Sequence, residues 1–166
     1  MYISSDLINK YSLVVSGHFD KTLKFHDWRQ EQKVLEIETS HSEPITSVDV
    51  SFDKNMLVTN SRDNTLQVFD TRSNRVMKIL THPQYCCSTE YLTKAYFKPN
   101  TNDVIAVPSC VNSFSENSAN GIFIFNTNSN SFELIAHQCR VNDIAFSNNG
   151  SLIGATTGKL EIFKQE

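Results

Sequence analysis

Apolar and polar residues alternate along short stretches of this chain, and polar turns separate the stretches. The clearest example is LVTNSRDNTLQVFD, from Leu57 to Asp70. A short apolar run is followed there by a polar turn at 60–64 and then by an alternating run that stops at Asp70. Because successive side chains of a strand point to opposite faces, this pattern predicts two antiparallel strands joined by a tight turn.

The same pattern recurs along the chain. It stands 43 positions earlier as LVVSGHFDKTLKFHD, at 13–27, so that Asp20 matches Asp63. Weaker copies are NGIFIFN, at 120–126, and GKLEIFK, at 158–164. A strand–turn–strand unit that repeats at roughly 40–45 residues is typical of the blades of a β-propeller.

Four units of antiparallel strands are therefore expected, with boundaries at about 1–38, 39–80, 81–135 and 136–166. No segment keeps a helical period, so the chain is predicted to be all-β. The first three units should hold four strands each and the last only three. The result is a partial propeller, an open arc with an incomplete last blade whose strand edges attract other strands. The expected strands are 5–8, 11–16, 22–26, 33–37, 44–50, 56–59, 65–69, 76–80, 91–97, 104–107, 121–125, 132–135, 141–146, 152–155 and 159–163.

Composition narrows the function classes. The 166 residues carry a net charge of −3, and the basic residues are scattered, which argues against a nucleic-acid partner. The apolar runs are far shorter than a membrane span, and the first residues do not read as a signal peptide. The four cysteines form no C-x-x-C pair, which favours reduced thiols in a cytoplasmic protein.

The residues also carry a family resemblance. HSEPITSVDVSFDKNMLVTNSRDNTLQVFD, at 41–70, resembles a WD repeat over its whole length. His41 stands at the His of the Gly-His signature, Asp63 at the turn aspartate, and Phe69 at the Trp of the Trp-Asp pair. SGHFDKTLKFHD, SRDNTLQVFDTRSNRVMKIL and AFSNNGSLIGATTGKLEIF resemble, in order and spacing, the C-terminal propeller of the autophagy-related protein sixteen family.

This resemblance implies a polar staple inside a blade. In the family, the Trp donates to a strand hydroxyl, which bonds the His, which bonds the turn Asp. No unit here keeps the Trp, but a network of His41, Thr59 or Ser61, and Asp63 can survive, with Asp20 at the equivalent turn. A His, a Ser and an Asp in one blade could also suggest a hydrolase triad. Recurrence at the repeat spacing favours a structural role instead.

The sequence contains no motif that is typical of a small-ligand site, but it predicts a protein-binding surface. There is no Gly-rich phosphate loop, and the histidines are dispersed, so we expect no catalytic residue, cofactor or metal. In a WD propeller, the loops after the second and fourth strands open on one face. Phe19, Arg62, Tyr85 and Arg140 fall in such loops, and aromatic and Arg residues are the usual anchors of interfaces.

The resemblance implies a non-catalytic scaffold. Such a protein would help to direct the lipid conjugation of a ubiquitin-like protein during autophagosome formation, in the cytoplasm or at the surface of precursor membranes. Its partners would be the conjugation machinery or membrane-protein tails. The alternatives are a WD-repeat adaptor of another pathway, such as a ubiquitin-ligase substrate receptor, a propeller enzyme, or a fragment without independent function. The Ser- and Asn-rich insertion at 109–120 is expected to be mobile without a partner.

Overall fold

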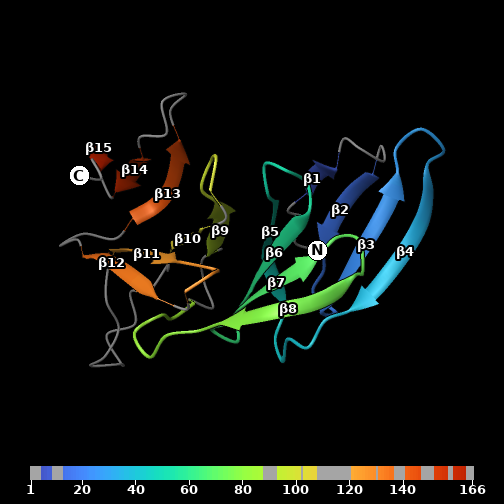
Figure 1. Ribbon diagram of the computed structural model, residues 1–166, viewed down its shortest axis with the longest axis horizontal. Helices are drawn as coiled ribbons and strands as arrows, with labels where there is room; N and C mark the ends of the chain where they lie inside the picture. The colour runs from blue at the N-terminus through green and yellow to red at the C-terminus, as the bar shows by residue number, and fades with distance from the viewer. Residues whose placement is uncertain are drawn as a thin grey trace.

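The fold is described by a computed structural model that covers residues 5–8, 13–87, 93–101, 103–107, 121–129, 131–136, 141–146, 152–156 and 159–163. Every regular element in these ranges is a strand, and the strands form four antiparallel sheets. The sheets stand side by side in chain order, each with its first strand toward the inside of an arc (Figure 1). We call them blades 1 to 4.

The strand order is the same in every blade, and each strand pairs with its neighbours in sequence. The expected all-β partial propeller is confirmed, and the strand ends differ from expectation by no more than three residues. Blade 1 holds β1 (Ser5–Ile8), β2 (Leu13–Gly17), β3 (Thr22–Asp27) and β4 (Gln32–Glu38). Blade 2 holds β5 (Ile45–Val50), β6 (Met56–Ser61), β7 (Leu66–Asp70) and β8 (Arg75–Leu80). Blade 3 holds β9 (Lys94–Phe97), β10 (Val104–Val107), β11 (Gly121–Phe125) and β12 (Phe132–Ala136); blade 4 holds β13 (Val141–Phe146), β14 (Leu152–Thr156) and β15 (Lys159–Phe163).

The internal repeat is visible in the register of the strands. Val15 faces Phe25 across β2 and β3, and Val58, 43 positions later, faces Val68 across β6 and β7. Alternation along these strands sends one set of side chains to each neighbouring blade. Because both faces of blade 2 are covered, β6 and β7 are buried at nearly every position, including the polar residues Thr59, Asn60, Ser61 and Gln67.

Apolar side chains fill the space between neighbouring blades. Between blades 1 and 2, Leu23 and Phe25 pack in one cluster with Leu57 and Phe69. Between blades 2 and 3 the cluster includes Val58, Leu66, Val68, Phe97 and Phe123. Between blades 3 and 4 it includes Ile122, Ile124, Val141 and Ile144. Each blade is therefore stabilised mainly by burial against its neighbours, as in other repeat architectures.

A buried polar network also joins blades 2 and 3. Asn60, at 0% exposure, donates through Nδ2 to Thr46 Oγ1 at 3.0 Å and to the Thr93 carbonyl at 3.1 Å. Its Oδ1 accepts from the Tyr85 hydroxyl at 2.9 Å. The Cys87 thiol lies 3.8 Å from both ends of the same amide. We call these five residues the Asn60 network; it links β5 and β6 to the segment that leads into β9.

The position of Tyr85 corrects the sequence-based expectation of an exposed interface anchor. Its side chain is only 2% exposed, and its ring packs edge-on against Phe123 and Phe125, with centroids 5.4 and 6.0 Å apart. Burial raises the pKa of its hydroxyl well above the usual value. Tyr85 is a core residue because its ring fills the space between blades while its hydroxyl finds a partner in Asn60.

Candidate protein-interaction surface

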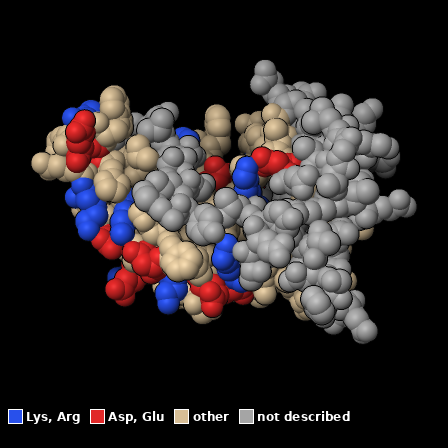
Figure 2. Space-filling view, turned by 180° about the vertical axis from the view of Figure 1, so that it is seen from behind, with Lys and Arg blue, Asp and Glu red and all other residues tan. Residues whose placement is uncertain are grey.

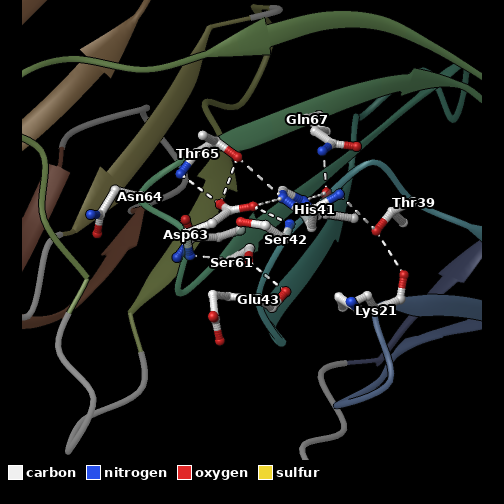
Figure 3. A network of polar contacts seen from close by, with 12 residues as sticks. Lys21, Thr39, His41, Ser42, Glu43, Ser61, Asp63, Asn64, Thr65 and Gln67 are labelled. Carbon is white, nitrogen blue, oxygen red and sulfur yellow. Dashed lines mark hydrogen bonds and ion pairs between the residues drawn. The ribbon is translucent and has the colours of Figure 1, made fainter.

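A buried staple lies at the end of blade 2 where β6 turns into β7 (Figure 3). Nδ1 of His41 lies 3.0 Å from Oδ2 of Asp63 and 3.1 Å from Oγ1 of Thr65, while Nε2 lies 2.8 Å from Oγ1 of Thr59. The Thr59 hydroxyl is also 3.4 Å from the Gln67 carbonyl, to which it can donate. The structure thus brings together His41, Thr59 and Asp63, and adds Thr65, which sequence reasoning did not name.

The local sequence explains the shape of this turn. Oδ1 of Asp63 accepts from the backbone N–H of Thr65 at 3.0 Å and from its hydroxyl at 2.7 Å, which closes a short Asx-type turn. Asn64 takes a positive φ of 65°, a conformation that Asn tolerates better than most residues. The remaining oxygen, Oδ2, is then free to accept from the Ser42 N–H at 2.9 Å as well as from His41.

These contacts change the acidity of the turn aspartate. Burial alone would raise the pKa of the Asp63 carboxyl, but the hydrogen bonds from His41 and Thr65 outweigh it and lower the pKa to about 2. The carboxylate side chain is only 9% exposed, so solvent screens these bonds weakly. Asp63 therefore stays ionised in the folded chain under conditions in which an unfolded aspartate would be protonated.

Acid should consequently weaken the staple. Because the pKa of Asp63 is lower in the folded chain than the unfolded value of about 3.9, its stabilising effect is complete above about pH 4 and is lost as the pH falls toward about 2. A shift of this size corresponds to roughly 2 kcal/mol. Melting temperatures measured across that window should fall less steeply for Asp63→Asn than for the parent chain. Equal slopes for the two proteins would contradict this assignment.

Blade 1 has the same turn without the histidine. Oδ1 of Asp20 accepts from the Thr22 N–H at 3.2 Å and from the Thr22 hydroxyl at 2.6 Å, and the latter bond lowers the pKa of Asp20 to about 2. The other oxygen lies 3.3 Å from Nζ of Lys24 in a solvent-exposed pair. The Ser16 hydroxyl, which matches Thr59, contacts Nε2 of His18 at 2.9 Å instead. Asp20 is 56% exposed, so water screens its interactions much more than those of Asp63.

The staple belongs to a continuous surface made of loops, which we call the loop face: the β2–β3 turn, the β4–β5 loop and the β6–β7 turn. On one side, the Thr39 hydroxyl donates to the Lys21 carbonyl at 2.7 Å and Ile45 N–H donates to the His18 carbonyl at 3.3 Å. On the other side, Arg62 N–H donates to the Pro44 carbonyl at 3.1 Å. The three loops are thereby held together as one preorganised surface, which lowers the entropy cost of binding.

Phe19 lies on the loop face, and its ring is 59% exposed. It occupies the β2–β3 turn next to Asp20, whose carboxylate closes that turn through Thr22. The turn therefore does not need an apolar side chain at this position. Among the exposed large apolar side chains of the described residues, Phe19 is the one that the sequence placed on this face.

The other three predicted anchors behave differently. Arg62 is in the β6–β7 turn of the loop face, where it is half-buried. Tyr85 is buried between blades 2 and 3 and cannot contact a partner. Arg140, like the insertion at 109–120, lies outside the described residues. The structure therefore brings Phe19 and Arg62 to one face and removes Tyr85 from it.

Two exposed aromatic residues were missed by sequence reasoning. Trp28 is 60% exposed in the β3–β4 turn, and Phe52 is 75% exposed in the β5–β6 turn. Both turns lie at the ends of the blades opposite to the loop face, because the strands of each blade alternate in direction. The signal that could have found Phe52 is the one that found Phe19: a large apolar residue inside an otherwise polar turn.

The histidine of the staple is enclosed by neighbouring side chains. His41 is 4% exposed and both of its ring nitrogens contact neighbouring side chains, so it cannot act on a substrate. No group of three or more His, Cys, Asp or Glu in the described ranges could hold a metal ion. No helix of the described chain is long and apolar enough to cross a bilayer. On the face seen in Figure 2, basic and acidic side chains are interspersed where the chain is described.

Comparison with known proteins agrees with this arrangement. The model of the WD domain, G-beta repeat, matches residues 32–70 and 127–159. The chain is similar to Protein Atg16l2 of Mus musculus, with 28% identity over 89% of this chain and 22% of the relative, and to Autophagic-related protein 16.2 of Caenorhabditis elegans, with 30% identity over 78% and 22%. Among solved structures, the WD40 β-propeller domain of Doa1 superimposes with a TM-score of 0.74 at 15% identity, over 98% of this chain and 50% of that one. The chain thus spans about a fifth of the length of these two relatives.

Proposed function

Because this chain belongs to the WD-repeat β-propeller family, we propose that it is a non-catalytic protein-interaction scaffold that acts in autophagy. The assignment to autophagy is supported by the similarity to two autophagy proteins over 89% and 78% of the chain. The scaffold role is supported by the buried histidine staple and by the preorganised loop face. On this proposal the chain works in the cytoplasm or at the surface of autophagosome precursor membranes.

The finer role follows from the same similarity. We propose that the chain brings proteins of the conjugation machinery, or the tails of membrane proteins, to the place where a ubiquitin-like protein is attached to lipid. The partner contacts the loop face, and Phe19 is its central anchor. An aromatic ring that is exposed on a rigid loop surface gains a large apolar contact at little cost in side-chain entropy, which is why such residues dominate binding energies.

Replacement of Phe19 by alanine tests this surface. Truncation of a central aromatic anchor commonly costs about 30-fold in affinity. We therefore expect Phe19→Ala to abolish the capture of autophagy proteins by the immobilised chain from a cell extract, measured by quantitative mass spectrometry. Its melting temperature should stay close to that of the parent, because the ring is mostly exposed.

Trp28→Ala is the matched control. Trp28 and Phe19 are exposed to the same degree, 60% and 59%, but Trp28 lies at the opposite end of its blade. Trp28→Ala should therefore capture the same proteins as the parent chain. If Phe19→Ala still captures all of these proteins, the binding site lies elsewhere on the chain. A large fall in its melting temperature would show that Phe19 contributes to the packing of the core.

A further inference from the structure

The outer strands of blades 1 and 2 carry the same exposed apolar feature. β4 ends the sheet of blade 1 and β8 ends the sheet of blade 2, on the outside of the arc (Figure 1). Val34 lies on β4 and Met77 lies on β8, 43 positions later, so the two residues are equivalent in the repeat. Their side chains are 59% and 61% exposed. We call the outward surface of these two strands the rim.

A β-bulge produces each of these exposed side chains. The register of β3 with β4 skips Val34, and the register of β7 with β8 skips Met77, so each is the extra residue of its strand. A bulge re-aims the side chain of its extra residue, and bulges are often conserved for that purpose. Neither residue belongs to the apolar clusters between the blades. Ile79, which is 53% exposed, extends the apolar surface along β8.

The two halves of the rim carry opposite charge. The repeat-equivalent segments are 27–38 and 70–81. The first holds four acidic and two basic side chains, a net charge of −2, and the second holds one acidic and three basic side chains, a net charge of +2. Some of these groups pair inside the chain, namely Asp27 with Arg29, Glu36 with Lys33 and Lys24, and Asp70 with Arg72.

The charges outside these pairs give the rim its polarity. Glu31 and Glu38 on blade 1, and Arg75 on blade 2, form no ion pair with another described residue. Lys78 donates to the Thr127 carbonyl, which is a neutral acceptor, so its charge is not compensated there. An apolar strip that is acidic in one half and basic in the other is complementary to a second copy of itself.

We propose that two copies of this chain associate rim to rim, with β4 of each copy beside β8 of its partner. A two-fold axis parallel to these strands creates both contacts at once. Because β4 and β8 start at equivalent positions of the repeat, Val34 then faces the partner's Met77, and Glu31 lies beside the partner's Arg75. An axis across the strands would instead set β4 against β4 and β8 against β8, where like charges repel. The rim lies apart from the loop face, so the pair presents two loop faces to partners.

Sedimentation velocity of the full chain tests this association. Over a wide range of protein concentration at low salt, the parent should approach a dimer as the concentration rises, and high salt should weaken the dimer. Met77→Lys should weaken association about 10-fold, because it places a charge at the apolar centre of both contacts. Its melting temperature should match that of the parent, since the side chain is mostly exposed.

Reversal of single charges identifies which strands meet. Glu31→Arg and Arg75→Glu should each weaken association about 10-fold, because each sets like charges side by side in both contacts. An equimolar mixture of the two variants should associate as tightly as the parent, because each contact between unlike variants again joins opposite charges. This rescue depends on the pairing of β4 with β8 and is not expected from any other contact surface.

Phe132→Lys is the matched control. Phe132 is 46% exposed on β12, the outer strand of blade 3, which lies outside both contacts, so this variant should associate like the parent. The proposal is overturned if the parent sediments as a monomer at every concentration, or if the mixed charge variants associate no better than either alone. Association that survives Met77→Lys would also overturn it, by placing the contact on another surface such as the outer edge of β15. If Met77→Lys melts below the parent, the charge variants decide the outcome.

Discussion

Replacement of Asp63 by alanine is expected to lower the melting temperature of the chain by about 5–10 °C. The carboxylate accepts hydrogen bonds from His41, Ser42 and Thr65, and the His41 ring is 4% exposed. Without the carboxylate, Nδ1 of His41 keeps only the Thr65 hydroxyl as a neighbour and the Ser42 N–H loses its acceptor, at a cost of about 2–3 kcal/mol. In a chain of this size, each kcal/mol shifts the melting temperature by about 2–4 °C.

Asp20→Ala provides the matched comparison for this effect. Asp20 closes the same kind of turn through Thr22, but no buried histidine contacts it and its side chain is 56% exposed. Its loss should lower the melting temperature by no more than about 3 °C. The difference between the two variants isolates the contribution of His41 and Ser42. If both variants melt alike, the staple does not stabilise blade 2 beyond its turn.

Asn60→Ala should have an effect of similar or greater size, about 10 °C. One amide holds the Thr46 hydroxyl, the Thr93 carbonyl and the Tyr85 hydroxyl, all at low exposure between blades 2 and 3. Alanine would remove the acceptor of the buried Tyr85 hydroxyl and would open a cavity. It would also remove the bonds that the amide donates to Thr46 Oγ1 and the Thr93 carbonyl, which keep their mutual bond at 2.9 Å. Lost buried hydrogen bonds and cavities are main causes of large destabilisation. Circular dichroism melts of the variant and the parent measure the difference directly.

Tyr85→Phe separates the network from simple packing. It keeps the ring against Phe123 and Phe125 and removes the hydroxyl with its bond to Asn60, so we expect a fall of about 3 °C. The double variant Asn60→Ala with Tyr85→Phe should be less destabilised than the sum of the two, because the second change removes a hydroxyl already left unpaired. Strict additivity would show that Asn60 and Tyr85 do not act together.

Exposed rings occur at both ends of the blades. Phe19 is 59% exposed in a turn that the bonds between Asp20 and Thr22 close, and Phe52 is 75% exposed in a turn that the bond from Lys54 to Ser51 closes. The turn that carries Phe19 is also tied to the β4–β5 loop through Lys21 and Thr39. A blade arrangement leaves two such faces accessible because the sides of each blade are buried against its neighbours.

Much of the fold follows from local pattern alone. Short alternating or apolar runs between polar turns located the strands, because an extended run bounded by turn residues is a local property of the chain and does not depend on its neighbours. The repeat of Asp20 at Asp63 identified the blade unit for the same reason. The exposure of Phe19 could also be anticipated from the sequence. It stands between His18 and Asp20 in a tight polar turn, and the local pattern does not direct its ring toward the core.

Tertiary packing decided the rest. Tyr85 lies in a polar segment between two strands, so the sequence predicts that its side chain is exposed. It is buried between two blades instead, where Asn60, 25 positions earlier, accepts the hydrogen bond of its hydroxyl. A depression lined by Phe52, Tyr96 and Phe146 exists only because the ends of β5, β9 and β13 lie close together, and no spacing along the chain predicts that proximity. Which side chains are covered depends on what the neighbouring blade presents, so burial and grooves become visible only once the blades are placed side by side.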